Sequence, residues 1–347
     1  MKIKSIPIAE LEIISESDKK GIAGTINLID ANTLASIKPM GTQEILEYIP
    51  GINGFSDDGI GNSRINIGIR GINPRRSSRV LILEDGIPIQ PAIYVYPNMY
   101  YNPPSERIHK VEVIKGSGSI LYGPQTMGGV VNYLTKKPSN NSRPAIKVTG
   151  GNNGYMSAFI ETGTVSKIKY KPEMQLLYKR GDGFRENNGF YQINGTFKLN
   201  YDKNKNENYY FKSNINKENT NATYSGLTLY SFENDPNYNP KEHDNFDILR
   251  ASVDLIHTKK IGENITVKTS SFLSYFDRKW WRENDVFINA DSLDSYQNNN
   301  TIITGDYDAP YDDLNLNIVR YGDNQYSFGI LRRFFVAGIE KKYILQN

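Results

Sequence analysis

Residues 190–201, "FYQINGTFKLNY", alternate between two kinds of side chain. The odd positions are mostly apolar or aromatic: Tyr191, Ile193, Phe197, Leu199 and Tyr201. The even positions from 192 onward are polar: Gln192, Asn194, Thr196, Lys198 and Asn200. Because successive side chains of a β-strand point to opposite faces, this stretch predicts a strand with one apolar, aromatic-edged face and one polar face.

The same alternation of apolar and polar residues recurs from residue 144 to the end of the chain. In "FDILRASVDLIH", residues 246–257, Leu249 and Val253 alternate with Arg250 and Asp254. Similar candidates are "AIKVTGG", "YMSAFIETG", "EMQLLYKR", "ENYYFKSNIN", "NITVKTSSFLSYF" and "FGILRRFFVAGIE". Two-sided strands of this length with aromatic ends are typical of an outer-membrane β-barrel. A soluble antiparallel sandwich has the same alternation, so single strands leave both interpretations open.

Composition narrows the function classes. The 41 basic and 38 acidic side chains nearly balance, which disfavours nucleic-acid binding. With no cysteine and three histidines in no ligand spacing, the chain predicts no transition-metal site. No nucleophile elbow or paired-carboxylate constellation is present, so no catalytic residue and no enzymatic activity are predicted. No run of 18 apolar residues predicts a membrane-spanning helix, and the first residues lack the apolar core of a signal peptide.

Residues 21–143 predict a small α+β domain. Strands are expected at "TINLI" (25–29), "RIHKVEVIKG" (107–116) and "GVVNYLT" (129–135), with two short helices between residues 30 and 51. Asp85-Gly86 predicts a type I′ hairpin turn in "RVLILEDGIPI". Strict alternation in "RINIGIRG" (64–71) predicts a half-buried strand.

Five glycines punctuate residues 116–129 of "VEVIKGSGSILYGPQTMGGVVNYLT". A phosphate-binding loop is one interpretation, but the third glycine of a dinucleotide motif and the lysine of a P-loop are both missing. The pattern therefore favours tight turns and close packing between strands.

These segments, in this order, resemble the plug domain of TonB-dependent outer-membrane receptors, most closely the ferric citrate group. The motifs are "TQEILEYIPGI", "IGIRGINPRRSSRVLILEDGIPI" and "ERIHKVEVIKGSGSILYGPQTMGGVVNYLTKKP", and the resemblance covers residues 10 to 140. It implies a flexible arm (1–20), an α+β plug domain (21–143) and antiparallel transmembrane β-barrel strands (144–347). The last segment has room for about nine strands, fewer than a plugged barrel needs, so an incomplete barrel is expected, from a fragment or a truncated gene.

The resemblance also implies a function. The expected protein is a monomeric outer-membrane receptor of a Gram-negative bacterium that imports a ferric chelate, ferric citrate first, into the periplasm. Its expected partners are the energy-transducing protein TonB, the chelate and outer-membrane lipid. Iron would arrive already chelated, so no protein-bound cofactor is expected. The alternatives are another ligand (haem, another siderophore or vitamin B12), a non-transporting surface binding protein, or a truncated product.

Three residue sets follow from the resemblance. The expected TonB box, which would pair with TonB as an added strand, comprises Glu10, Leu11, Glu12, Ile13, Ile14 and Ser15. The expected ion pairs of plug cations with barrel glutamates involve Arg70 and Lys115. The expected ligand contacts are Arg75, Arg76, Gln90, Tyr94, Tyr96, Asn98 and Tyr100.

Each of these sets has an alternative. The arm could be a plain disordered tail, and Arg70 and Lys115 could contact the ligand instead of barrel glutamates. Guanidinium groups bind carboxylates in a forked geometry, which suits a citrate complex, although adjacent loop arginines also occur as an ordinary solvated surface. The tyrosines either line a pocket or pack the plug against the barrel wall.

Overall fold

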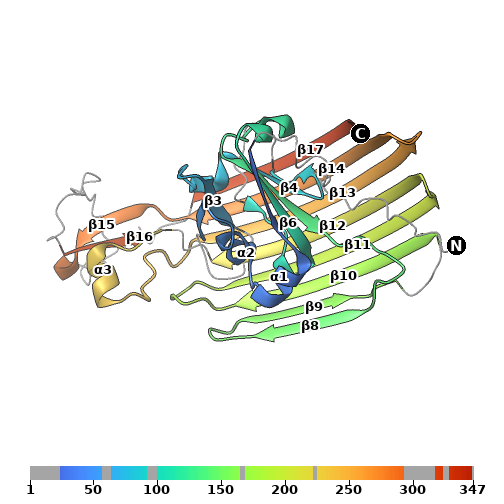
Figure 1. The fold of residues 1–347 in the computed structure, drawn as a ribbon. Coiled ribbons are helices and arrows are strands. Elements are labelled where there is room, and N and C mark those ends of the chain that lie inside the picture. The colour runs from blue at the N-terminus through green and yellow to red at the C-terminus, as the bar shows by residue number, and fades with distance from the viewer. Residues whose placement is uncertain are drawn as a thin grey trace.

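The structure is a computed structural model that describes residues 24–56, 64–91, 100–164, 169–221, 225–292, 317–322 and 328–345. Two parts are visible: an N-terminal domain (residues 24–135) and a large sheet of long strands against which it lies (Figure 1). No helix among the described residues is long and apolar enough to cross a membrane.

The N-terminal domain is built on a mixed sheet with the strand order β1-β6-β7-β4-β5 among the described residues. Its strands are β1 (Thr25–Ile29), β4 (Val80–Glu84), β5 (Ile87–Pro88), β6 (Ile108–Lys115) and β7 (Gly129–Thr135). Helices α1 (Ala31–Ile37) and α2 (Thr42–Glu47) follow β1, and β2 (Ile52–Ser56) pairs with β3 (Ile65–Ile69). The predicted α+β class is confirmed. Asp85 and Gly86 both have positive φ, as a type I′ turn between β4 and β5 requires.

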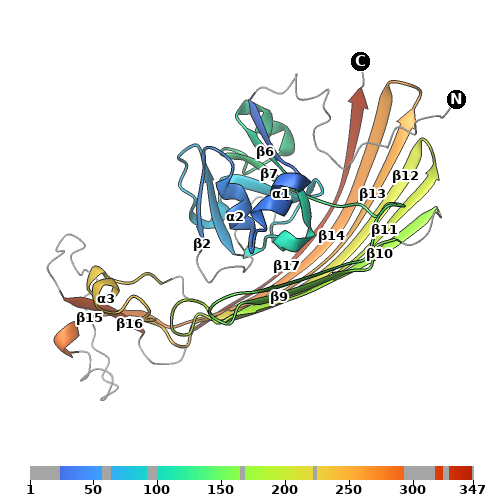
Figure 2. The same cartoon turned by 60° about the horizontal axis from the view of Figure 1, so that its bottom comes forward.

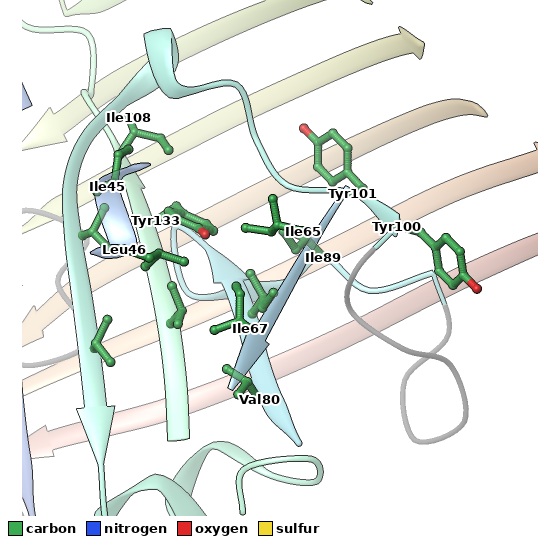
Figure 3. Packing of buried hydrophobic residues seen from close by; sticks show 14 of the residues in the cluster. Ile45, Leu46, Ile65, Ile67, Val80, Ile89, Tyr100, Tyr101, Ile108 and Tyr133 are labelled. Atoms are coloured by element: carbon green, nitrogen blue, oxygen red, sulfur yellow. The ribbon is translucent and has the colours of Figure 1, made fainter. Parts of the chain in front are cut away.

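The core of this domain is aliphatic and aromatic. Ile45 and Leu46 of α2, Ile67 of β3, Val80 of β4 and Tyr133 of β7 meet in one buried cluster (Figure 3). Burying each of these side chains stabilises the fold by roughly 1.5–3 kcal/mol. Ile45 and Leu46 therefore lie on the face of α2 that packs into this core.

β3 differs from its prediction. All five residues of β3 are buried, so the expectation of a half-buried strand is wrong. The polar face is covered by the turn at residues 75–77, where the Asn66 side chain accepts a hydrogen bond from the Arg76 N–H at 2.6 Å. The alternation correctly predicts which side chains of β3 are polar. It cannot predict that a later segment of the chain covers the polar face.

The glycine-rich segment forms a 3₁₀ turn, Ser117–Tyr122, bracketed by Gly116 and Gly123. These glycines have φ/ψ of 104°/−166° and 101°/−154°, a region that only glycine adopts readily. The interpretation as turn residues is therefore confirmed for both, whereas the close packing is found at Gly128 and Gly129, where an added Cβ would lie 3.0 Å from Arg79 O and 2.4 Å from Ile114 O.

The described residues place eight strands in the large antiparallel sheet, in the order β17-β14-β13-β12-β11-β10-β9-β8. These strands are β8 (Ala145–Gly150), β9 (Met156–Glu161), β10 (Tyr170–Gly181), β11 (Phe190–Asn204), β12 (Glu207–Asn221), β13 (Asn245–Ile261), β14 (Ile265–Arg282) and β17 (Phe328–Leu345). The sheet is open and curved, and the N-terminal domain lies on its concave side (Figure 2). The predicted fold class, an α+β domain followed by part of an antiparallel barrel wall, is confirmed. The boundary predicted at residues 143/144 falls in the connection between β7 and β8.

The two ends of the sheet differ. At the short-turn end, residues 205–206 join β11 to β12 and residues 262–264 join β13 to β14. At the long-loop end, β12 is followed by β13 and β14 by β17 after longer connections, whose described residues include α3 (Leu229–Asn234), β15 (Asp285–Asn289) and β16 (Ile318–Gly322). The β15–β16 hairpin extends beyond the sheet (Figure 1). In membrane barrels the longer connections face the outside.

The two faces of the sheet differ as the alternation predicts. On β11, Gln192, Asn194 and Lys198 are buried on the side of the N-terminal domain, whereas Tyr191 and Ile193 are exposed on the other side. Tyr170, Tyr201, Tyr209 and His257 form a row of stacked rings across four strands on the outward side near the short-turn end. The polar face therefore meets the N-terminal domain and the apolar face points away from it.

Candidate functional site

The interface between the N-terminal domain and the sheet is centred on Lys212 of β12. Its ammonium nitrogen lies 3.1 Å from Glu84 Oε1 and 2.6 Å from Asp85 Oδ2, both at the hairpin turn after β4. Asp254 Oδ2 on the neighbouring strand β13 lies 3.4 Å away. All four side chains are buried, so these charges interact with little screening by water.

Arg107 completes this cluster from the N-terminal domain. Its guanidinium pairs with Glu84 and also donates a 3.0 Å hydrogen bond to Asn194 Oδ1 on β11. Burial alone would raise the pKa of the Glu84 carboxyl, but the attraction of Arg107, Lys212 and Arg250 outweighs it and lowers the pKa to about 2. Glu84 is therefore ionised at neutral pH and holds both cations.

A second buried pair lies nearby. Lys179 Nζ on β10 is 3.1 Å from the Glu106 carboxylate and donates a 2.8 Å hydrogen bond to the carbonyl of Met40. Ser157 on β9 donates to Glu106 Oε1 at 2.8 Å. Burial works to raise the pKa of Glu106, but the charge of Lys179 together with hydrogen bonds from the backbone, Ser157 and Lys179 outweighs it, so the pKa is lowered. Buried pairs of this kind are costly to break singly, because the remaining charge is left without a partner.

Toward the long-loop end the interface becomes aromatic. The rings of Tyr100 and Phe246 on β13 stack with centroids 5.8 Å apart. The Arg64 guanidinium lies 4.2 Å from the Phe246 ring centroid, and that of Arg278 lies 4.9 Å from the Tyr100 centroid. Tyr100 is 2% exposed, which corresponds to the packing alternative that the sequence left open for the tyrosines. Its contact with a ligand stays a prediction.

Arg70 and Lys115 lie close to each other within the N-terminal domain. Arg70 is exposed and donates to Thr25 Oγ1 at 3.4 Å, whereas Lys115 donates to the carbonyl of Pro50 at 2.6 Å. Burial, with a smaller contribution from Arg70, lowers the pKa of Lys115. In the part of the chain that the structure describes, neither forms an ion pair with a strand carboxylate, so their pairing with barrel glutamates stays a prediction.

Arg75 and Arg76 are presented to solvent by a fixed turn. Ser77 Oγ accepts a 2.9 Å hydrogen bond from Ile67 N and donates a 3.0 Å hydrogen bond to Ile65 O. Arg76 has a φ of 61°, and both arginine side chains are exposed. Within the described ranges no carboxylate pairs with either guanidinium. The arrangement supplies two neighbouring cations suited to a carboxylate or phosphate ligand.

Of the other expected ligand contacts, the structure describes Gln90 and Tyr100, and both are buried. Gln90 is 1% exposed and donates from its amide to Gln125 Oε1 at 3.0 Å. Its own carbonyl oxygen is buried with no hydrogen-bond partner among the described residues. Tyr94, Tyr96 and Asn98 lie outside the described residues, as does the whole of the expected TonB box. The structure shows no cluster of metal-ligating side chains among the residues it describes.

Sequence reasoning missed the lysines that join the two parts. Three buried lysines lie on the polar face of predicted strands: Lys179, Lys198 and Lys212. When another domain covers such a face, each buried ammonium group needs a carboxylate or carbonyl partner. That signal could have singled them out as interface residues. It could not have named Glu84 as a partner of Lys212, because the two residues are 128 positions apart.

The N-terminal domain matches a known family. Residues 18–130 match the family model described as TonB-dependent Receptor Plug Domain. The vitamin B12 transporter BtuB of Vibrio vulnificus is 32% identical over 119 residues, covering 34% of this chain and 19% of the relative. The ferric enterobactin receptor PirA of Pseudomonas aeruginosa is 30% identical over 147 residues, covering 39% of this chain and 19% of the relative. The chain thus spans about a fifth of the length of these relatives.

Solved structures share the fold over a longer stretch. The unliganded ferric citrate transporter FecA has a TM-score of 0.68 at 22% identity, covering 79% of this chain and 43% of that one. The ferric-catecholate import receptor Fiu from E. coli K12 has a TM-score of 0.61 at 15% identity, covering 76% and 40%. At these identities the likeness shows the fold alone, including the sheet that the family model does not reach. Residues 18–130 are therefore similar to the plug domain of TonB-dependent receptors, and the described residues have the fold of such a plug domain followed by part of a barrel wall.

Proposed function

We propose that this chain is part of a receptor that carries an iron chelate across the outer membrane, driven by TonB, with ferric citrate as its ligand. The N-terminal domain is from here on called the plug. The observation that carries the proposal is the seating of the plug on the polar face of an amphipathic sheet through Lys212 and Lys179, while the apolar face points away. A plug that fills the lumen of a membrane-spanning barrel blocks free diffusion, which is what controlled import requires. The family consists of transport receptors, and catalysis is not part of the proposal.

The ligand proposal rests on Arg75 and Arg76. Two exposed guanidiniums on a turn fixed by buried Ser77 can bind the carboxylates of a ferric citrate complex with charge-assisted hydrogen bonds. FecA, whose fold this chain shares, is a ferric citrate transporter, and the two curated relatives transport vitamin B12 and bind ferric enterobactin. Those two ligands are therefore the alternatives to be tested beside ferric citrate.

Replacing both arginines with glutamine is expected to weaken ferric citrate binding roughly ten- to a hundredfold, because each lost charge-assisted hydrogen bond costs about 1.5–3 kcal/mol at most and solvent exposure reduces that cost. Binding of iron-labelled citrate to outer membranes that contain the receptor measures the effect. Arg333→Gln is the matched control, since Arg333 is an exposed arginine on the outward face, 3.4 Å from Asp277. Equal affinities for the double variant and the control would remove the arginines from the binding site.

Deleting residues 10–17 tests the proposed coupling to TonB. In the receptor expressed from its own gene, the deletion is expected to leave ligand binding unchanged and to reduce uptake to the level of cells without TonB. Binding and uptake of the same labelled chelate are measured in parallel. Uptake that persists at the parental rate would contradict the assignment of the TonB box to Glu10–Ser15, while loss of binding would show that the arm serves the ligand site instead.

A further inference from the structure

The inward face of β12, β13, β14 and β17 carries an excess of positive charge. The even-numbered residues of these strands share that face, because the register pairs even positions with even positions. They include three carboxylates (Glu218, Asp254 and Glu340) and eight cations: Lys212, Arg250, Lys260, Lys268, Arg278, Arg282, Arg332 and Lys342. Because cations on a covered face need partners, the surplus has to be matched by groups outside these strands.

Four of these cations follow one another from the long-loop end toward the middle of the wall, and we call them the inner cation series. Arg282 is the last residue of β14, and Arg278 lies four residues before it. Arg250 of β13 is two residues beyond the register partner of Arg278. Lys212 of β12 is four residues beyond the register partner of Arg250. At about 3.3 Å per residue, each step is roughly 7–13 Å, which is comparable to the screening length of about 8 Å in physiological salt.

Aromatic rings of the plug cover the two middle arginines of the series. The ring centroid of Tyr100 lies 4.9 Å from the guanidinium carbon of Arg278, and that of Tyr101 lies 4.5 Å from the guanidinium carbon of Arg250. A cation over an aromatic face keeps a favourable partner while it is buried, and all four side chains are buried. The plug lies on the concave side of the sheet (Figure 2), so its withdrawal takes both rings away and leaves the guanidiniums facing the lumen.

Carboxylates of the plug cover the last member of the series, Lys212. Glu84 Oε1 at 3.1 Å and Asp85 Oδ2 at 2.6 Å belong to the plug, whereas Asp254 Oδ2 at 3.4 Å belongs to the wall. Two of the three carboxylates at this ammonium group therefore leave when the plug leaves. They occupy the positions that the carboxylates of an anionic cargo would take.

We propose that the inner cation series is a path that guides an anionic chelate along the wall once the plug withdraws. Glu84 and Asp85 stand in for the carboxylates of the cargo while the plug is seated. The proposal rests on the proposed function, in which the cargo is an iron complex with several carboxylates. It is separate from ligand capture, because Arg75 and Arg76 belong to the plug and move with it, whereas the inner cation series stays on the wall.

The ion selectivity of the receptor in planar lipid bilayers tests this path without any chelate. The receptor is expressed from its own gene, urea unseats the plug, and the reversal potential is measured under a gradient of potassium chloride. The open parent channel is expected to prefer chloride over potassium about threefold or more, because a passage lined by cations concentrates anions. Arg250→Gln with Arg278→Gln is expected to lower this preference roughly twofold or more. Arg250→Lys with Arg278→Lys keeps both charges and is expected to retain it.

Arg180→Gln with Arg333→Gln is the matched control. It removes two arginines from the outward face, where their side chains are 49% and 69% exposed, and is expected to keep the reversal potential of the parent. Arg282→Gln is a second test variant, used if the inward double variant fails to fold, because its ring contacts, Trp280 and Phe328, both belong to the wall. A parent channel that prefers potassium, or inward variants with the reversal potential of the control, would overturn the proposal.

Uptake of iron-labelled citrate separates the path from the proposed function. The variant with Arg250→Gln and Arg278→Gln is expected to bind the chelate with the affinity of the parent and to import it roughly fivefold more slowly. A parent that neither binds nor imports ferric citrate would contradict the ligand proposal, while the shift in reversal potential would still support the path. Import at the parental rate by the inward double variant would overturn the path.

Discussion

Lys212→Gln is expected to loosen the plug from the barrel wall and to destabilise their association by about 3–5 kcal/mol. The substitution removes one buried cation and leaves Glu84, Asp85 and Asp254 facing one another with less compensation. Two measurements follow the change: protease sensitivity of the plug in receptor-containing membranes, and entry of a large antibiotic that the intact membrane excludes. Both are expected to rise.

Lys217→Gln is the matched control for this prediction. Lys217 is on the same strand, but its side chain is 36% exposed and its pair with Asp247 lies on the outward face. Exposed pairs contribute about 0–1 kcal/mol, so the plug should remain seated. Lys212→Arg keeps the charge and is expected to restore most of the protection. Similar protease sensitivity in the Lys212→Gln and Lys217→Gln variants would show that the buried cluster does not hold the plug.

Gly129→Ala is expected to disrupt the plug itself. Gly129 has a φ of 150°, and a Cβ there would lie 2.4 Å from the carbonyl oxygen of Ile114 in the neighbouring strand β6. The dihedral strain alone costs roughly 1–3 kcal/mol, and separating β6 from β7 adds to it. Chemical denaturation of the detergent-solubilised receptor, followed by plug-specific proteolysis, measures the loss.

Gly150→Ala is the corresponding control. Gly150 ends β8, has no positive φ, and a Cβ there would meet nothing within 4 Å. It is expected to leave the unfolding transition unchanged within about 0.5 kcal/mol. If Gly129→Ala is tolerated equally well, the glycine-rich segment is not the close-packed element described here.

The sequence was informative wherever structure depends on neighbours in the chain. The alternation in residues 190–201 predicts which side of β11 is polar, because the period of two is a local property of strands. Asp85-Gly86 predicts its hairpin turn for the same reason, since the required φ values belong to those two residues. These features hold whatever the rest of the chain does.

The sequence alone did not predict the contacts between segments that are far apart in the chain. The covering of β3 by the turn at Arg75–Ser77 and the pairing of Glu84 with Lys212 depend on how separate elements dock. The resemblance to the receptor family directed attention to plug cations, whereas the buried pairs across this interface join plug carboxylates to strand lysines. Local pattern predicted amphipathic strands and the family resemblance predicted the fold class, whereas the ion pairs of the interface depend on contacts between segments far apart in the chain.

The orientation of the two sheet faces is the central claim, and adjacent residues of β13 test it most directly. The chain has no cysteine, so Val253→Cys and Ser252→Cys each provide a unique site for a spin label. Val253 is 43% exposed on the outward face, and Ser252 is 6% exposed beneath the plug. In reconstituted membranes, lipid-soluble oxygen should relax the label at position 253 strongly while a water-soluble nickel complex should not, and both should be weak at position 252. Strong relaxation by the nickel complex at position 253, or the reverse pattern at the two sites, would contradict the account.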